Sequence, residues 1–257
     1  MVRAKRKYRV RKWVFWSLGV FFVGIVGYVI YQWWRSREDR FIRYQEFGIE
    51  IPVNYSIHGI DVSWHQGKIN WAMVKAMDVR GVQIDFAFIK ATEGLGRVDA
   101  QFRRNWEEAR DAGLCRGAYH FFLATKSGRA QAENFLETIT LEPGDIPPVL
   151  DVEETYGVKD TVLKSRVQEW LDVVQTSTGV KPIIYTNVDF YKRHLGNTFD
   201  AYPLWAAHYL QEENPRIDRE WFFWQHSETG HVSGINTRVD FDVFKGDSLA
   251  FKALLIP

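Results

Sequence analysis

The chain has 257 residues, enough for one large domain or two small ones, and its 46% hydrophobic and 25% charged residues exclude disordered and low-complexity classes. A single cysteine, Cys115, excludes an intramolecular disulfide and a zinc site built from cysteines. Ten Lys and Arg against two acids give residues 1–40 a net charge of +8, which leaves −7 on the other 217 residues and argues against nucleic-acid binding.

The first element in chain order is an uncharged segment over residues 13–34, with the sequence WVFWSLGVFFVGIVGYVIYQWW. As a helix it extends about 33 Å, roughly one bilayer core, and aromatic residues lie at both ends as in interfacial belts. A buried core helix and a cleaved signal peptide are the alternatives. The run is longer than the apolar region of a signal peptide, and Trp33-Trp34-Arg35 offers no small-residue cleavage site. We therefore predict an uncleaved transmembrane signal anchor.

The residues on either side of this segment predict its orientation. Seven basic residues and no acid lie between Arg3 and Lys12, so the segment 1–12 is expected in the cytoplasm. The rest of the chain is then expected in the periplasm or outside, held at the cytoplasmic (inner) membrane by a single pass. Residues 35–55 are a charged, mixed stretch that we interpret as a juxtamembrane linker, and we place the soluble domain at 56–257.

The soluble domain alternates short apolar segments with amphipathic ones, which indicates the α/β class. Helices are predicted over 100–112, 127–138 and 162–176, between the first five strands. The predicted strands are 57–63, 86–92, 116–122, 148–153, 182–187, 204–209, 222–226 and 239–244. This order fits a TIM-like (β/α) barrel with few helices at its C-terminal end. Two doubly wound halves are the alternative, but no Gly-rich phosphate loop follows any strand.

A (β/α) barrel carries its site at the C-terminal ends of its strands, and polar residues collect at these positions. They are Asp61, Lys90 with Glu93, His120, Asp151 with Glu153, Tyr185 with Asn187, His208 with Tyr209, Gln225 with His226, and Asp240 with Asp242. Because all eight predicted strands agree, the sequence predicts a polar pocket at one end of the barrel.

Four carboxylates are the candidates for chemistry in this pocket. Asp151 and Glu153 come at the end of an apolar strand with one residue between them. Because side chains alternate along a strand, both point to the same face, about 6.6 Å apart along the chain. Asp61 and Asp240, at the ends of the first and eighth strands, become neighbours when the barrel closes. Carboxylates in a confined site cannot all stay ionised, and a protonated carboxyl beside an ionised one is what glycosidic-bond cleavage requires.

Two other uses of these acids remain as alternatives. Each acid alone could cap a helix or pair with an arginine. Together with His120 they could hold a hard cation, but the sequence has no calcium-loop or HExxH pattern. We predict neither a metal nor a cofactor.

Seven motifs occur in a fixed order over residues 57–244. They are GIDVSWHQG (59–67), FIKATEG (88–94), GAYHF (117–121), LDVE (150–153), LWAAHY (204–209), WQHS (224–227) and GINTRVD (234–240). These motifs resemble those of family 25 glycoside hydrolases, the muramidase-type lysozymes. The resemblance implies an irregular (β/α)₅(β)₃ barrel and hydrolysis of the β-1,4 bond between N-acetylmuramic acid and N-acetylglucosamine in peptidoglycan.

The resemblance also implies roles for the acids. Glu153 matches the general acid of the family, Asp151 the carboxylate that stabilises the intermediate, and Asp61 and Asp240 the acids that complete the pocket. The chain departs from the pattern at Asp242, where many members have asparagine. It also has a tryptophan before His65-Gln66, where a histidine is often present.

Aromatic residues make up 16% of the chain, more than a core normally needs, which suits a protein that stacks on ring-shaped ligands. A membrane segment or the core accounts equally well for part of this content. The residues expected to bind substrate are Tyr185, Tyr119, Trp205, Trp224, Gln225, Lys90 and Glu93. For Glu93, the alternative is that it holds Lys90 and the turn at Gly94.

The leading hypothesis is a membrane-anchored lysozyme that binds peptidoglycan glycan strands. A chitinase-like hydrolase is the enzymatic alternative, although the fuller DxxDxDxE pattern expected of it is absent upstream of Asp151. A non-catalytic cell-wall-binding protein is the alternative from another class, and the presence of all four acids argues against it.

Overall fold

The computed structural model describes residues 2–38, 41–211 and 214–257, which divide after residue 42 into two units. The first unit contains helix α1 (Val2–Glu38). Within α1, the stretch Phe15–Trp33 is long and apolar enough to cross a membrane, and none of it is buried.

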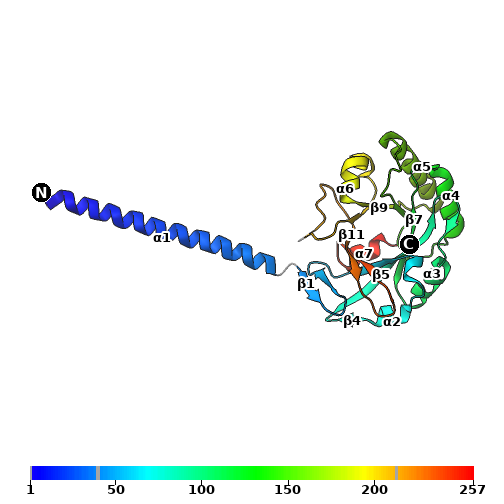
Figure 1. The fold of residues 1–257 in the computed structure, drawn as a ribbon, viewed down its shortest axis with the longest axis horizontal. Coiled ribbons are helices and arrows are strands. Elements are labelled where there is room, and N and C mark those ends of the chain that lie inside the picture. The colour runs from blue at the N-terminus through cyan, green and yellow to red at the C-terminus, as the bar shows by residue number, and fades with distance from the viewer. Residues whose placement is uncertain (1, 39–40, 212–213) are drawn as a thin grey trace. The chain divides into compact units, whose positions relative to one another are not determined.

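The second unit is built on a closed barrel of eight strands with helices around it (Figure 1). In order around the barrel the strands are β3 (His58–Val62), β5 (Val82–Glu93), β7 (Cys115–Phe121), β8 (Val149–Asp151), β9 (Ile183–Asn187), β10 (Leu204–Ala207), β11 (Phe223–Gly230) and β12 (Val239–Phe244). Each pairs with the next, and β3 pairs with both β5 and β12, which closes the ring. The predicted α/β barrel is thereby confirmed.

The last strand runs against the others. The seven strands from β3 to β11 are parallel to their neighbours, whereas β12 is antiparallel to both β11 and β3. Asp240 therefore lies near the beginning of its strand, which corrects the expectation that it lies at the end. The register nevertheless places Asp240 directly opposite Asp61, so both carboxylates are at the same mouth of the barrel.

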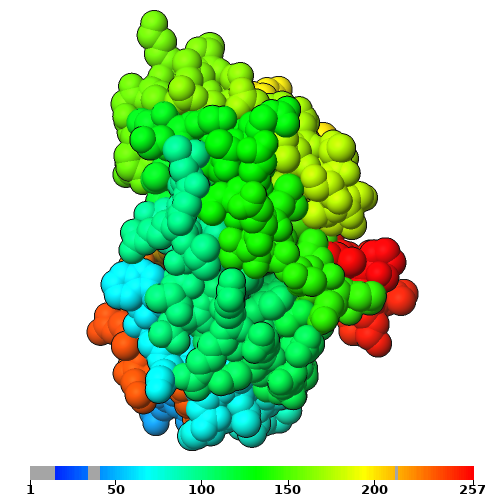
Figure 2. Space-filling view, turned by 90° about the vertical axis from the view of Figure 1, so that its right-hand side faces the viewer, coloured from blue at the N-terminus to red at the C-terminus, as the bar shows by residue number. Residues whose placement is uncertain are grey.

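Helical segments follow the first five barrel strands. They are α2 (Trp71–Ala76), α3 (Phe102–Asp111), α4 (Gly128–Thr138), α5 (Asp160–Thr178) and α6 (Val188–Phe190), and α6 continues into single turns up to Phe199. Within the described residues no helix separates β10, β11 and β12, which gives the (β/α)₅(β)₃ arrangement. Figure 2 shows the side covered by α3, α4 and α5, with the C-terminal segment at its edge. Two short strands, β4 (Asp78–Val79) and β6 (Arg97–Val98), pair with β5.

Part of the segment expected as a linker is a hairpin. Strands β1 (Phe41–Tyr44) and β2 (Ile49–Pro52) form a two-stranded sheet, and Phe47, Ile49 and Ile51 are buried in the core outside the barrel wall. The compact unit accordingly begins at residue 43, before the expected start at 56. The sequence did not predict β2, because two isoleucines in four residues are too short a pattern to distinguish a strand from a charged linker.

Aromatic side chains fill the part of the barrel interior that lies away from the mouth, which we call the floor. Phe88 of β5 stacks on Trp205 of β10 with ring centroids 4.1 Å apart, and Phe86 packs against Phe251 of α7 (Ser248–Leu254) at 5.7 Å. Gly59 on β3 provides the space, because a Cβ there would lie 2.3 Å from the Phe86 ring. Part of the high aromatic content therefore forms the floor of the barrel.

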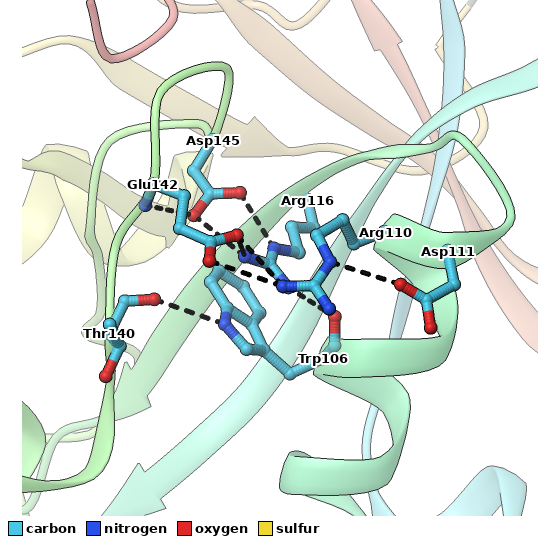
Figure 3. Close-up of polar contacts among 7 residues, drawn as sticks. All are labelled: Trp106, Arg110, Asp111, Arg116, Thr140, Glu142 and Asp145. Carbon is cyan, nitrogen blue, oxygen red and sulfur yellow. Dashed lines mark hydrogen bonds and ion pairs between the residues drawn. The ribbon is translucent and has the colours of Figure 1, made fainter.

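A buried arginine ties β7 to its surroundings at the opposite end from the mouth (Figure 3). Arg116 is 1% exposed; its Nε donates to Asp145 Oδ1 at 2.8 Å and its Nη2 to Glu142 at 2.7 Å. Its Nη1 donates to the backbone carbonyl of Trp106 at 2.6 Å, and the guanidinium lies 4.0 Å from the Trp106 ring. The cluster holds α3 and the loop before β8 against the barrel.

We expect Asp145→Ala to lower the free energy of unfolding by about 3–5 kcal/mol, because it leaves the Arg116 charge buried without its main partner. Chemical denaturation of the full-length chain, followed by tryptophan fluorescence, measures the loss. Asp111→Ala is the matched control: Asp111 is paired with Arg110 in the same cluster but both are exposed, so the loss is expected to be below about 1 kcal/mol. Equal losses for the two variants would contradict the assignment.

Candidate active site

A pocket of about 280 Å³ opens at the mouth of the barrel, where the parallel strands end. It is lined by Asp61, Val62, Ser63, His65, Gln66, Lys90, Tyr119, Phe121, Asp151, Glu153, Tyr185, Trp205, Gln225 and Asp240. A larger groove of about 660 Å³ lies against α2 and α3 and contains none of the predicted site residues. The small pocket is therefore the place where the predicted residues meet.

Nine of the eleven predicted site residues line this pocket, and two do not. Trp224 is fully buried on the outer face of β11, where its indole N–H donates to the carbonyl of His208 at 2.9 Å. Glu93 accepts hydrogen bonds from Lys90 at 2.8 Å and from Arg97 at 3.2 Å. Glu93 therefore does not line the pocket itself but contacts Lys90, which does. This agrees with the alternative role, in which Glu93 holds Lys90.

Asp151 and Glu153 enter the pocket from β8. The backbone N–H of Val152 donates to the carbonyl of Tyr185 at 2.9 Å, so the pairing with β9 continues past the end of the strand and both acids face inward. Asp151 Oδ1 is buried and accepts no hydrogen bond from the described residues. Burial, and then the charge of Glu153, raises the pKa of Asp151 well above its usual value. Burial also raises the pKa of Glu153, which a hydrogen bond from Tyr185 partly opposes.

Asp61 and Asp240 face this pair from β3 and β12. Asp61 is 8% exposed, and its Oδ2 accepts a 2.6 Å hydrogen bond from Gln225 Nε2. Burial and the nearby Asp240 raise the pKa of Asp61 well above its usual value. Burial, followed by the charge of Glu228, raises the pKa of Asp240 to about 6. The pocket therefore holds protons on carboxyl groups near neutral pH.

Two phenols orient the side chain of Gln225. Its Oε1 accepts a 2.6 Å hydrogen bond from Tyr209 and lies 2.9 Å from the Tyr185 hydroxyl, whose single proton is shared between Gln225 and Glu153. The Nε2 of Gln225 donates to Asp61. Tyr209 was not among the predicted site residues, although it belongs to the LWAAHY motif. The bond from Gln225 holds the Asp61 carboxyl in one orientation toward the pocket.

Ser63, His65 and Gln66 also line the pocket, and none of them was among the predicted site residues. Ser63 caps a short helical turn, since its Oγ accepts from the His65 N–H and its own N–H donates to Gln66 Oε1 at 2.8 Å. His65 Nδ1 lies 2.9 Å from Ser63 Oγ. The sequence feature that could have indicated these residues is the motif GIDVSWHQG, whose second half directly follows the first barrel strand.

The chemistry open to this site is that of its carboxyl groups. In the part of the chain that the structure describes, no group of three or more His, Cys, Asp and Glu side chains is arranged to hold a metal ion. The four acids provide groups that can donate a proton and groups that can face a developing positive charge.

Comparison with known proteins identifies the family. Residues 60–235 match the model of glycosyl hydrolases family 25. The uncharacterized protein YegX of Escherichia coli K12 is 49% identical over 202 residues, which cover 79% of this chain and 74% of that protein. Lysozyme M1 of Streptomyces globisporus is 34% identical over 213 residues, covering 77% and 71% of the two chains. The crystal structure of a lysozyme from Streptomyces coelicolor superposes with a TM-score of 0.70 at 34% identity, covering 77% of this chain and 96% of that one. The chain therefore belongs to glycosyl hydrolase family 25 and is a glycoside hydrolase of the lysozyme kind.

Proposed function

We propose that the protein is an N-acetylmuramidase that hydrolyses the β-1,4 bond between N-acetylmuramic acid and N-acetylglucosamine in peptidoglycan. The observation that carries the proposal is the meeting of four carboxyls, Asp61, Asp151, Glu153 and Asp240, in one pocket above an aromatic floor. Similarity to lysozymes over most of the domain supports the substrate class.

In this mechanism Glu153 protonates the oxygen of the leaving sugar, and Asp151 stabilises the positive charge that develops on the other sugar. Glu153 lies two residues beyond Asp151 and is less buried, so it can reach the glycosidic oxygen. In the empty pocket, the deeper burial of Asp151 favours the proton on Asp151. An N-acetyl N–H that donates to Asp151 stabilises its anion, and the proton that Asp151 releases is then available to Glu153.

The other lining residues bind and orient the sugars. Asp61 and Asp240 complete the pocket, and the rings of Tyr119, Tyr185 and Trp205 offer rigid surfaces to a sugar ring. Lys90 and Gln225 offer hydrogen-bond donors. The expected route is retaining, and both a covalent and a substrate-assisted intermediate are compatible with these residues.

Full-length protein incubated with peptidoglycan should release new muramic-acid reducing ends, and it should release none from chitin oligomers. Glu153→Gln should lower kcat by about 10²–10⁴ with substrate binding kept, because the amide cannot donate the proton. Asp151→Asn should also be severe, and the two losses should not add, since the groups act as a unit. Reducing-end analysis by mass spectrometry and initial rates measure both effects.

Glu154→Gln is the matched control, because it makes the same chemical change at an exposed neighbour that does not line the pocket. It should stay within about twofold of wild type. Release from chitin would support the chitinase-like alternative, and release from neither polymer would support the wall-binding alternative. Near wild-type lysis by Glu153→Gln would move the general acid to Asp61 or Asp240.

Tyr185→Phe should move the alkaline limb of the kcat profile to higher pH. The Tyr185 hydroxyl stabilises the Glu153 anion and so lowers its pKa; without it the pKa of Glu153 rises, and the acid stays protonated to higher pH. Tyr209→Phe removes the other phenol on Gln225 and should leave the alkaline limb in place. A limb that moves to lower pH in Tyr185→Phe, or that moves equally in both variants, would contradict this role of Tyr185.

We also propose that residues 13–34 are a single-pass anchor in the cytoplasmic membrane, with segment 1–12 in the cytoplasm and the catalytic domain outside. The apolar stretch Phe15–Trp33 and the basic residues before it support this. A phosphatase reporter that functions only outside the cytoplasm, fused after Pro257, should be active, and the fusion should remain in the membrane fraction. An inactive reporter would reverse the orientation, and a shortened soluble form would indicate a cleaved signal sequence.

A further inference from the structure

Trp64 is an exposed tryptophan in the loop that follows β3, at the mouth of the barrel. Its side chain is 44% exposed, whereas the other tryptophans of the described residues from 43 onward are buried. It is also the tryptophan at which the motif GIDVSWHQG departs from the family pattern. A single exposed apolar side chain is common on protein surfaces and by itself indicates no function. What distinguishes Trp64 is how firmly it is held and what lies beside it.

The backbone of Trp64 is held by a buried carboxylate. Its N–H donates to Asp99 Oδ2 at 2.9 Å, and Asp99 is 7% exposed. The other oxygen, Asp99 Oδ1, accepts from the N–H of Gln101 at 2.9 Å. The N–H of Asp99 in turn donates to the carbonyl of Ala91 on β5 at 2.9 Å. Because both carboxylate oxygens and the backbone of Asp99 are bonded, Asp99 fixes Trp64 to β5 and to the start of α3.

The turn that carries the indole is closed on its other side as well. Residues Trp64–Gln66 form a single helical turn capped by Ser63, and the carbonyl of Trp64 accepts from the N–H of Gly67 at 3.0 Å. Gly67 has a φ of 64°, in the region that favours glycine. Gln66 Nε2 donates to the carbonyl of Arg238, just before β12, at 3.2 Å. The turn is therefore tied to β5 on one side and to the approach to β12 on the other.

The indole ring stacks on a ring that belongs to the pocket. The centroids of Trp64 and His65 are 3.9 Å apart and their planes make an angle of 29°. His65 Nδ1 lies 2.9 Å from Ser63 Oγ, which restrains the imidazole. His65 lines the pocket and Trp64 does not. The indole therefore lies just beyond the edge of the pocket, with its neighbouring ring held in place.

The pocket is too small to enclose a glycan strand. Its volume of about 280 Å³ is below the range of about 300–1,000 Å³ that is typical of sites for drug-sized ligands. The four carboxyls line it, so it contains the place at which cleavage is proposed. A polymer bound there must leave the pocket over its rim, and its next sugars then contact the side chains of the rim.

A sugar ring suits the surface that Trp64 presents. The C–H groups on one face of a pyranose carry a small positive charge, and the face of an indole is negative, so the two pack favourably. An indole that the protein already holds in place loses little conformational entropy when it binds. The surface is flat and uncharged, which favours a sugar face over a charged peptide group.

We propose that Trp64 binds a sugar of the glycan strand outside the pocket, in an outer subsite on the β3 side of the mouth, and that Asp99 is the positioning residue that holds it there. This inference rests on the proposed function, whose substrate it extends to a strand longer than the sugars inside the pocket. It predicts that the protein binds long strands more tightly than short ones, and that the difference depends on Trp64.

The first test measures binding without cleavage, in full-length protein that carries Glu153→Gln. Peptide-free oligomers of alternating N-acetylglucosamine and N-acetylmuramic acid, two or six sugars long, are titrated by displacement calorimetry. Adding Trp64→Ala should raise the Kd of the six-sugar oligomer about 10-fold and that of the disaccharide less than about twofold. Equal changes for the two lengths, or no change for either, overturn the proposal.

Two further replacements separate stacking from apolar contact. Trp64→Phe keeps a flat ring and should retain most of the preference for six sugars, whereas Trp64→Leu is apolar without a ring and should lose it as Trp64→Ala does. Leu249→Ala is the matched control, because Leu249 is exposed on α7 at the floor of the barrel, and it should change neither Kd. Full retention of the preference by Trp64→Leu overturns the assignment to a stacked sugar.

The second test repeats the titration with six-sugar oligomers that bear stem peptides. If Trp64 contacts a sugar, the loss in Trp64→Ala is the same with and without the peptides. A loss that occurs only when the peptides are present would assign Trp64 to the peptide and overturn the proposal.

The third test concerns Asp99. Asp99→Asn removes one acceptor for the backbone N–H groups and should raise the Kd of the six-sugar oligomer about 3-fold. In a chain that already has Trp64→Ala it should cause no further rise, because its effect passes through the indole. Additive losses, or an equal loss for the disaccharide, would make Asp99 a merely structural residue. If Asp99→Asn does not fold, the Trp64 titrations still decide the subsite.

The outer subsite and the proposed function fail in different ways. If wild type cleaves no peptidoglycan but Trp64→Ala weakens six-sugar binding, the hydrolase proposal fails and the subsite stands. If wild type cleaves peptidoglycan and Trp64→Ala binds six sugars as tightly as the unaltered chain, the subsite alone is overturned.

Discussion

The alternation of side chains along strands that close into a barrel determines the position of most groups in this site. On β5 the inward residues Phe86, Phe88 and Lys90 run from an aromatic ring at the floor to a charge at the mouth. On β12, which runs in the opposite direction, Asp240 is at the mouth and Phe244 at the floor. Strands of both directions therefore place apolar side chains at the floor of the barrel and polar side chains at its mouth. The pocket is polar, and the interior beneath it is apolar.

The apolar floor explains why the pKa values of the acids are raised. Burial is the largest cause of the raised pKa values of Asp61, Asp151 and Asp242, and the neighbouring carboxyls add to it. Since Lys90 is already paired with Glu93, the pocket offers little positive charge to oppose these shifts. Groups of this kind lower stability at neutral pH, and the large aromatic and aliphatic core around them offsets that cost. The site thus holds protonated carboxyl groups, which the proposed cleavage of a glycosidic bond requires.

Sequence patterns were most informative where the residues of a single strand are sufficient for the prediction. All eight barrel strands were predicted close to their observed places, and Asp151 and Glu153 face the pocket as period-two alternation requires. The patterns were less informative where two candidates are neighbours in one strand. Trp224 and Gln225 point to opposite faces of β11, so only one of them can reach the pocket. Choosing between them requires the register with the adjacent strands, which is a property of distant parts of the chain.

The motifs and the spacing of polar residues were sufficient to identify the family, the barrel and the four acids at its mouth, because these follow from local order along the chain. The direction of β12 and the hydrogen bond from Gln225 to Asp61 became clear only in the folded structure. The connection 231–238 between β11 and β12 is too short for a crossover helix, so the last strand must turn back. The state of each carboxyl depends on burial and on partners up to 164 residues away, such as Gln225 for Asp61, and these arise only when the barrel closes.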